Sequence, residues 1–271
     1  MVLGIKNRIK KLSLKQEVVP IMVSTPSGCE LKGKVALISG GSGGIGLSIA
    51  KALKESGCNV IVAGTNEEKL EWIKNTTGLE TIVMNYLKPE SFDSVIAKVV
   101  SRYERIDIFV SSAGVHTENV SFWSMNPDEF DRVMDINLKG VYFACQSIGV
   151  YMKDNMVKGS ILIVSSSRGS EPAWSPYGIS KWGLKGLTEG LAKLLIPYGI
   201  NVNAIAPGST ATTLIGIKEG DSIFSEENGM YRLVVPDEIA TLAKLLVSDA
   251  GKMISGEVIH IAAGRGTFDI R

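Results

Sequence analysis

Cysteine and histidine are scarce in this sequence. Among 271 residues there are three cysteines (Cys29, Cys58 and Cys145) and two histidines (His116 and His260). Three widely spaced cysteines form neither a disulfide framework nor a zinc site, and two histidines cannot complete one. We therefore expect no metal centre, and the thiols fit a reducing, cytoplasmic compartment.

The sequence also lacks an excess of either charge. It has 29 Lys and Arg residues against 28 Asp and Glu residues, a formal net charge of +1. Binding along a nucleic-acid backbone requires a clear positive excess, so we expect no nucleic-acid partner. Hydrophobic residues make up 45% of the chain, which excludes a disordered protein.

Long apolar runs are missing as well. The longest stretch without a charged residue, residues 194–217, contains Pro197, Gly199, Pro207 and Gly208. A lipid-facing helix does not tolerate this composition, so we expect no membrane partner. The basic residues at the start of the chain also lack the apolar centre of a signal peptide.

Residues 1–30 differ from the rest and are interpreted as an N-terminal extension. Ile5, Ile9 and Leu12 have the spacing of a short amphipathic helix, and residues 25–28 have the composition of a linker. Packing of this segment on the domain or on a neighbouring subunit is favoured over a basic helix on a membrane surface, because three apolar positions make a weak anchor.

From residue 31 onward, short apolar runs alternate with amphipathic segments of helical length. This alternation indicates βαβ units and a parallel sheet covered on both faces. With right-handed crossovers, we predict a single α/β domain over residues 31–271, a doubly wound parallel sheet of about seven strands with a Rossmann fold. The expected strands are residues 35–39, 60–63, 81–84, 106–111, 160–165, 201–206 and 258–262.

A glycine-rich turn, SGGSGGIG at residues 39–46, follows the first expected strand and precedes a helical run at residues 47–53. Glycine lets backbone N–H groups approach a pyrophosphate at the helix N-terminus, where the dipole favours negative charge. The turn therefore predicts a dinucleotide site. Two glycine patterns fit it: G-x-G-x-x-G at Gly41, Gly43 and Gly46, and G-x-x-x-G-x-G at Gly40, Gly44 and Gly46.

Tyr177 and Lys181 lie four residues apart, which places both on one helical face. A charge at about 4 Å, with an effective dielectric of about 20, favours the phenolate by roughly 4 kcal/mol, or about three pKa units. We expect the Tyr177 pKa to fall toward neutrality, where a general acid or base works best. Taken alone the pair fits a surface contact, but a strand upstream ends in Ser165 and Ser166, whose hydroxyls can polarise a substrate oxygen.

Together these residues resemble the short-chain dehydrogenase/reductase family, from Leu31 to about Gly264. Residues 39–46 resemble the family's T-G-x-x-x-G-x-G turn, and residues 111–114 (SSAG) stand where the family has N-N-A-G. Asn137 matches its helix asparagine. Tyr177 and Lys181 match its Y-x-x-x-K motif, and residues 203–212 match N-x-x-x-P-G-x-x-x-T.

The resemblance implies an NAD(P)-dependent oxidoreductase that moves a hydride between a nicotinamide ring and a carbonyl or secondary alcohol. Tyr177 would be the general acid or base, with Lys181 binding the nicotinamide ribose and lowering the Tyr177 pKa. Ser166 would hold the substrate oxygen, and Asn137 would support a water-mediated proton relay. The implied cofactor-binding residues are Gly40, Ser42, Gly43, Gly44, Ile45, Gly46, Thr65, Asn85, Tyr86, Ala113, Gly114, Tyr177, Lys181, Pro207, Gly208 and Thr212.

Which serine acts stays open. Alignment from the strand favours Ser166, whereas counting back from Tyr177 favours Ser165. His116 follows the fourth expected strand and lies either near the mouth of the pocket or in a surface loop, and the surface loop is favoured. Trp123 and Trp174 are candidate walls of a substrate pocket.

The choice of cofactor depends on the end of the second strand. NAD enzymes place an acid there to accept hydrogen bonds from the ribose 2′-hydroxyl. By the resemblance this acid would fall at Gly64, and a basic residue for a 2′-phosphate would fall at Thr65 or Gly43. Because no carboxylate repels a phosphate there, we predict NADP(H) over NAD(H). Glu67 and Glu68 are the argument for NAD.

A catalytically silent NAD(P)-binding regulatory or sensor protein is the alternative function, and the intact Tyr177 and Lys181 argue against it. Residues 127–152 and 175–196 form helices with more large apolar residues than one buried face needs. Such helices pair between subunits in the family, so we expect a homodimer or homotetramer. By the same resemblance, residues 209–230 are a mobile substrate lid, whose mixed composition leaves the substrate's identity open.

Overall fold

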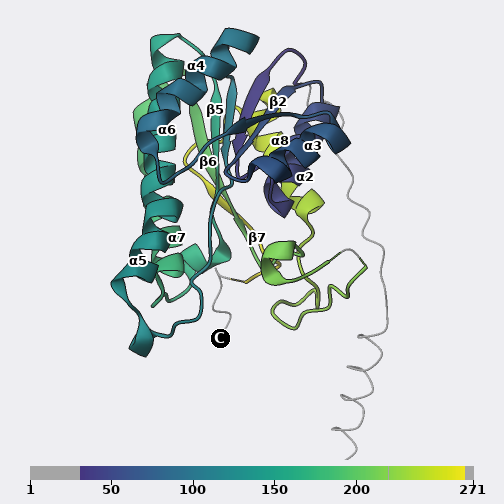
Figure 1. Cartoon of the computed structure of the whole chain (residues 1–271), viewed down its shortest axis with the longest axis vertical. Helices are drawn as coiled ribbons and strands as arrows, with labels where there is room; N and C mark the ends of the chain where they lie inside the picture. Colours follow the sequence, from purple (N-terminus) through teal and green to yellow (C-terminus); the bar gives the residue numbers. More distant parts are fainter. Residues whose placement is uncertain (1–30, 219, 266–271) are drawn as a thin grey trace, which may run out of the picture.

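The computed structural model describes residues 31–218 and 220–265 (Figure 1). The expected N-terminal helix at residues 5–12 lies outside the described residues. Within them, seven strands form one parallel sheet in the order β3-β2-β1-β4-β5-β6-β7, which confirms the predicted doubly wound sheet. The strands are β1 (Val35–Ser39), β2 (Asn59–Gly64), β3 (Glu80–Val83), β4 (Ile108–Ser111), β5 (Ser160–Val164), β6 (Asn201–Pro207) and β7 (Val258–Ile261).

Helices cover both faces of the sheet (Figure 1). One face packs against α2 (Gly44–Glu55), α3 (Glu67–Thr77) and α8 (Pro236–Val247). The other packs against α4 (Phe92–Tyr103), α6 (Val141–Asp154) and α7 (Pro176–Leu195), and α5 (Pro127–Met134) lies beside α7.

The strands are apolar at consecutive positions because successive side chains enter opposite layers of the core. In β1, Leu37 packs into the layer of α4, α6 and α7, and Ile38 packs into the layer of α2, α3 and α8. Both side chains are fully buried. Burial on both faces requires apolar residues at consecutive positions, and these are the continuous apolar runs from which the strands were predicted.

The helix expected over residues 127–152 is interrupted by a π-helical segment, η3 (Asp135–Gly140). Helical periodicity extends across it, so the sequence pattern alone does not reveal the wider turn. Short π-helical segments are frequent at functional sites. Here the segment carries Asn137, whose side chain is fully buried.

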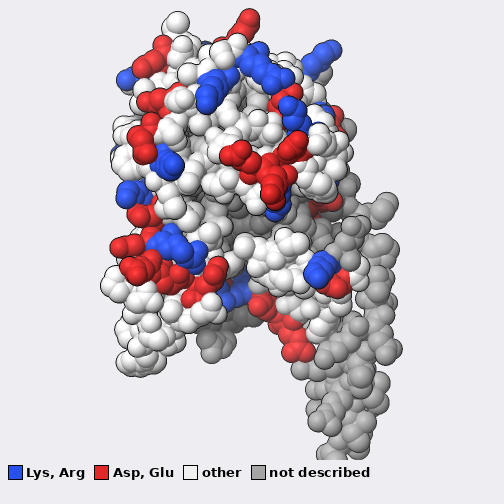
Figure 2. Space-filling model, viewed as in Figure 1, with Lys and Arg blue, Asp and Glu red and all other residues white. Residues whose placement is uncertain are grey.

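The order of the strands reverses at β1, which pairs with β2 on one side and β4 on the other. In open parallel sheets, ligands bind beyond the carboxyl ends of the strands at such a point. Among residues 31–218 and 220–265, no helix is long and apolar enough to cross a membrane. On the face shown in Figure 2, basic and acidic residues of the described chain are interspersed, without a broad basic area.

Candidate active site

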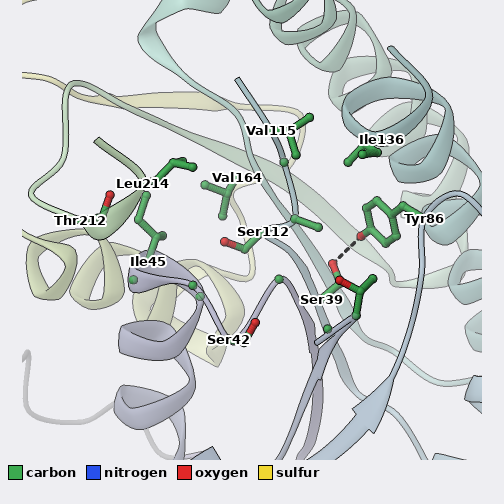
Figure 3. Close-up of a pocket in the computed structure, with 18 of the residues that line it drawn as sticks. Ser39, Ser42, Ile45, Tyr86, Ser112, Val115, Ile136, Val164, Thr212 and Leu214 are labelled. Atoms are coloured by element: carbon green, nitrogen blue, oxygen red, sulfur yellow. Dashed lines mark hydrogen bonds between the residues drawn. The ribbon is translucent and has the colours of Figure 1, made fainter. Parts of the chain in front are cut away.

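A cavity of about 420 Å³ opens at the carboxyl ends of the strands around β1 and β4. Figure 3 shows Ile45, Thr212 and Leu214 on one side of it and Tyr86 on the other. Most of the predicted site residues line it: Gly40, Ser42, Gly43, Gly44, Ile45, Gly46, Thr65, Asn85, Tyr86, Ala113, Gly114, Tyr177, Lys181 and Thr212. Asn137, Ser166, Pro207 and Gly208 are not part of the lining. Pro207 ends β6, and Gly208 follows it toward Thr212.

The glycine-rich turn after β1 forms the floor of this cavity. Gly40 has a φ of 65°, and a Cβ there would lie 2.4 Å from the backbone nitrogen of Ala113, so only glycine fits. Helix α2 begins at Gly44 with no side-chain cap and no acid in its first turn. Its first N–H groups are therefore free of side-chain partners at the cavity, and the turn fits a dinucleotide pyrophosphate.

Tyr177 lies in the first turn of α7, where Pro176 and the N-cap Ser175 start the helix. Its backbone N–H donates to Thr117 Oγ1 at 3.3 Å, and its hydroxyl is hydrogen-bonded to Ser166. Burial raises the pKa of Tyr177 above its ordinary value, while the Ser166 hydrogen bond and the positive charge of Arg168 act in the opposite direction. The expected lowering toward neutrality is therefore wrong for this structure.

The expectation fails because burial removes water from both Tyr177 and Lys181. The Lys181 ammonium donates to the Val164 carbonyl at 3.2 Å and lies 5.6 Å from the centre of the Tyr177 ring. Burial lowers the pKa of Lys181 to about 8. Loss of water penalises the charged forms of both residues, and spacing along a helix does not report it.

The two candidate serines have different partners. Ser165 lines the cavity and is buried, with its hydroxyl donating to the Lys181 carbonyl at 3.4 Å. Ser166 is partly buried, contacts the Tyr177 hydroxyl, and accepts a hydrogen bond from the Arg168 backbone at 3.2 Å. The structure therefore joins Ser166 to the phenol and Ser165 to the helix backbone.

Asn137 holds the loop after β4. Its Oδ1 accepts a hydrogen bond from the Val115 backbone N–H and its Nδ2 donates to the Val115 carbonyl, each at 2.8 Å. Its amide also lies 3.4 Å from Ser180 Oγ. A Cβ on Gly114 would lie 3.3 Å from Asn137 Oδ1 and 3.7 Å from Lys181 Nζ, so Gly114 lies close to both side chains.

His116 is the main correction among the individual residues. The structure favours the alternative near the mouth of the pocket over the surface loop, because His116 is partly buried, lines the cavity and stacks on the Tyr177 ring. Its carbonyl accepts a hydrogen bond from Arg132 at 2.7 Å, and Arg132 is paired with Glu129. The path of the loop, which no local pattern encodes, brings His116 to Tyr177.

Tyr86 closes the cavity beside β1 and β4. Its hydroxyl is hydrogen-bonded to Ser39 and, at 2.8 Å, to Ser111 (Figure 3 shows the Ser39 contact). Burial raises the pKa of Tyr86, so its phenol stays neutral in this cluster of hydroxyls. Ser111, at one of the positions where the family has asparagine, is thus held by Tyr86.

Sequence reasoning also missed Lys69, which lines the cavity although Glu67 and Glu68 do not. Its position four residues after Thr65, in the first turn of the next helix, was the available signal. The two tryptophans are not part of the cavity wall: Trp123 is 91% exposed and Trp174 is 52% exposed. Thr213 and Leu214 of the expected lid do line it.

Comparisons with known proteins extend over nearly the whole described chain. The family model of enoyl-(acyl-carrier-protein) reductase matches residues 40–265. The 3-oxoacyl-(acyl-carrier-protein) reductase of Rickettsia felis is 34% identical over 243 residues, which cover 87% of this chain and 98% of that protein.

Solved structures show the same arrangement. The 3-ketoacyl-(acyl-carrier-protein) reductase from Brucella melitensis, complexed with NADH, has a TM-score of 0.81 and 27% identity, covering 88% of this chain and 100% of that one. A short-chain type dehydrogenase/reductase from Mycobacterium marinum has a TM-score of 0.80 and 28% identity, covering 87% and 96%. The chain therefore belongs to the short-chain dehydrogenase/reductase family and is a nicotinamide-dependent oxidoreductase.

Proposed function

We propose that this enzyme reduces the ketone of a 3-oxoacyl thioester to the secondary alcohol, with NADPH as the preferred cofactor. The observation that carries the proposal is the phenol of Tyr177 in the wall of the cavity, with Lys181 beside its ring and with a pKa that burial raises. A phenol with a raised pKa stays protonated at neutral pH, and the protonated form is the proton donor that reduction requires. The Rickettsia felis relative, named for this activity, is matched over 98% of its length.

The residues around the cavity fit a dinucleotide, and each has a separate task. The glycine turn and the start of α2 would hold the pyrophosphate, Thr65 and Asn85 would contact the adenosine half, and Lys181 would bind the nicotinamide ribose. The cofactor, when bound, supplies the hydride that the side chains of this protein cannot provide.

The remaining steps belong to side chains. Ser166 donates a hydrogen bond to the ketone oxygen and Tyr177 passes its proton to that oxygen. Ser166 is near enough to the Tyr177 phenol to lower its pKa through a side-chain hydrogen bond, which supports a shared role at the ketone oxygen. The Lys181 ammonium near the ring stabilises the tyrosinate that remains. Asn137 holds the backbone of Val115 and so positions the loop that carries His116. We also assign to Asn137 the support of the water-mediated proton relay.

The same assembled set disfavours the sensor alternative, because the proton-donating tyrosine, the lysine and the serine are all retained. We place the catalytic domain at residues 31–271, with residues 1–30 as its extension. Cys58 and Cys145 are buried free thiols, which supports a cytoplasmic location.

We also propose a homodimer or homotetramer formed through α5, α6 and α7. These helices expose large apolar side chains, whereas a monomer rarely leaves a contiguous apolar surface in water. Exposed members are Phe130, Tyr142, Phe143, Val150, Ile179, Trp182 and Leu194.

The proposed reaction is tested by following NADPH oxidation with a panel of ketones: a 3-oxoacyl thioester, a simple cyclic ketone, a steroid ketone and a keto sugar. We expect the 3-oxoacyl thioester to give the highest kcat/KM. A higher value for any other ketone would reject the substrate class, and no oxidation with any ketone would favour the sensor alternative.

A further inference from the structure

The end of the cavity beside β2 combines neutral donors with one cation. Ser42 from the glycine turn, Gly64 and Thr65 from the end of β2, and Lys69 from α3 all line it. Strand β2 is where a dinucleotide fold distinguishes a ribose 2′-hydroxyl from a 2′-phosphate. The chemistry of these four residues therefore bears on the choice of cofactor.

Lys69 presents a charge that the protein does not neutralise. Among residues 31–218 and 220–265, its ammonium has no ion pair and no hydrogen bond, whereas Lys54 on α2 donates to the carbonyls of Thr77 and Gly78 at 2.8 and 3.0 Å. The backbone N–H of Lys69 is fixed by the N-cap Asn66 at 2.8 Å. The start of the side chain is thus held while its charged end stays free for a ligand.

The acids of the same turn do not compete for this position. Glu67 and Glu68 are exposed and outside the lining of the cavity, although they precede Lys69 directly. The first turn of α3 therefore turns its lysine, and not its carboxylates, toward the site. This removes the main argument for NAD that the sequence offered.

The space that an acidic side chain at residue 64 would need is occupied by Ser42. A Cβ built on Gly64 would lie 3.1 Å from Ser42 Oγ, closer than most real Cβ contacts. A carboxylate side chain at residue 64 would have to displace the serine hydroxyl. In its place the site holds a hydroxyl that can donate a hydrogen bond to a phosphate oxygen.

We propose that Lys69 binds the 2′-phosphate of NADPH, and that the hydroxyls of Ser42 and Thr65 donate hydrogen bonds to the same phosphate. The assignment rests on the NADPH preference proposed above and names the residue that produces it. An ammonium at this place compensates for the basic residue that is absent from positions 43 and 65. A phosphate dianion gains a charge-assisted contact there that a 2′-hydroxyl cannot make.

The test measures binding rather than turnover. Dissociation constants of NADPH and NADH are determined by fluorescence titration of the full chain and of Lys69→Gln, Lys69→Arg and Lys74→Gln. Lys74 is exposed in the last turn of the same helix and outside the cavity, so its variant controls for a general loss of positive charge. Adenosine 2′,5′-bisphosphate and adenosine 5′-monophosphate, as competitors, separate the phosphate contact from the nicotinamide end.

We expect Lys69→Gln to weaken NADPH and adenosine 2′,5′-bisphosphate at least tenfold, about 1.4 kcal/mol. NADH and adenosine 5′-monophosphate should change by less than twofold. Lys69→Arg should retain NADPH binding within threefold, and Lys74→Gln should match the unmodified chain. Unchanged melting temperatures would show that each variant is folded.

The possible failures are distinguishable. If the unmodified chain binds NADH more tightly than NADPH, the cofactor preference is wrong and the Lys69 assignment is rejected with it. If the chain prefers NADPH and Lys69→Gln retains that preference, the assignment alone is rejected. Equal weakening of both cofactors by Lys69→Gln would likewise reject a contact to the 2′-phosphate.

Discussion

The imidazole of His116 lies against the phenol ring of Tyr177, with ring centres 4.3 Å apart and planes inclined by 24°. Burial lowers the pKa of His116, and the positive charges of Lys181 and Arg168 lower it further, while Glu118 acts in the opposite direction. The histidine is therefore neutral at pH 7, and it covers one face of the proton donor with an uncharged ring.

The stack predicts a pH-dependent stability. An unfolded histidine titrates near 6.5, whereas folded His116 titrates lower, so the unfolded chain binds more protons as the pH falls below about 6.5. The unmodified chain should lose unfolding free energy between pH 7.5 and 5.5 relative to His116→Phe, which keeps an aromatic ring but cannot be protonated. Denaturant unfolding at both pH values measures this difference. Parallel losses in the two proteins would contradict it.

Replacing Tyr177 by phenylalanine should remove the proton donor and leave the nucleotide contacts in place. We expect kcat with any true substrate to fall below a tenth of its original value, and NADPH affinity to stay within about twofold. Steady-state kinetics and fluorescence titration measure the two effects. Retention of more than a tenth of the original kcat would remove Tyr177 from the mechanism.

Ser166→Ala and Ser165→Ala, compared side by side, identify the serine that holds the substrate oxygen. Because the Ser166 hydroxyl contacts Tyr177 and the Ser165 hydroxyl donates to the Lys181 carbonyl, we expect the larger loss of kcat from Ser166→Ala. The Ser166 hydrogen bond also lowers the Tyr177 pKa. Its loss should therefore move the basic limb of the pH–rate profile to higher pH. The reverse order of kcat losses would assign the role to Ser165.

Lys181→Met tests the cost of burying the ammonium. The pKa of Lys181 falls from 10.5 to about 8, so the unfolded chain binds more protons between these two pH values. The unmodified chain should therefore gain up to about 3 kcal/mol of unfolding free energy from pH 8 to 10.5 relative to Lys181→Met. Below pH 8 the difference in unfolding free energy between the two proteins should no longer change with pH. Denaturant unfolding across this range measures the difference, and equal pH profiles would show that folding does not lower the Lys181 pKa.

The proposed oligomer is tested by sedimentation at micromolar concentration, where the monomer mass is 29.1 kDa. We expect two or four times this mass. Phe143→Asp on α6 should shift the protein toward the monomer because it places a charge in the proposed apolar interface. Trp72→Asp on α3 is the control, because Trp72 is a larger and more exposed aromatic side chain on the opposite face of the sheet. A monomeric mass for the unmodified chain would reject the proposal.

The sheet could be predicted from sequence because the signal is local. Residues 35–39 read as a buried strand, and β1 has these bounds. Fourteen of the predicted cofactor residues line the cavity, and their order around the strand ends was enough to place them there. His116 and Lys69 depend on how a loop folds back and where the first turn of a helix points, and neither leaves a periodic pattern. The direction of the Tyr177 pKa shift depends on how much water burial removes, which spacing along a helix does not report.

The hydroxyl cluster at the centre of the sheet links positions that are distant in the chain. Tyr86 contacts Ser39 and Ser111, and a Cβ on Gly140 would lie 2.5 Å from Tyr86 Cβ, so the tyrosine also requires the glycine. Because of this mutual dependence, a substitution at any one of these four positions should change the effect of substitutions at the other three. An asparagine at position 111 alone would therefore place an amide against the Tyr86 hydroxyl in the position that the Ser111 hydroxyl now occupies.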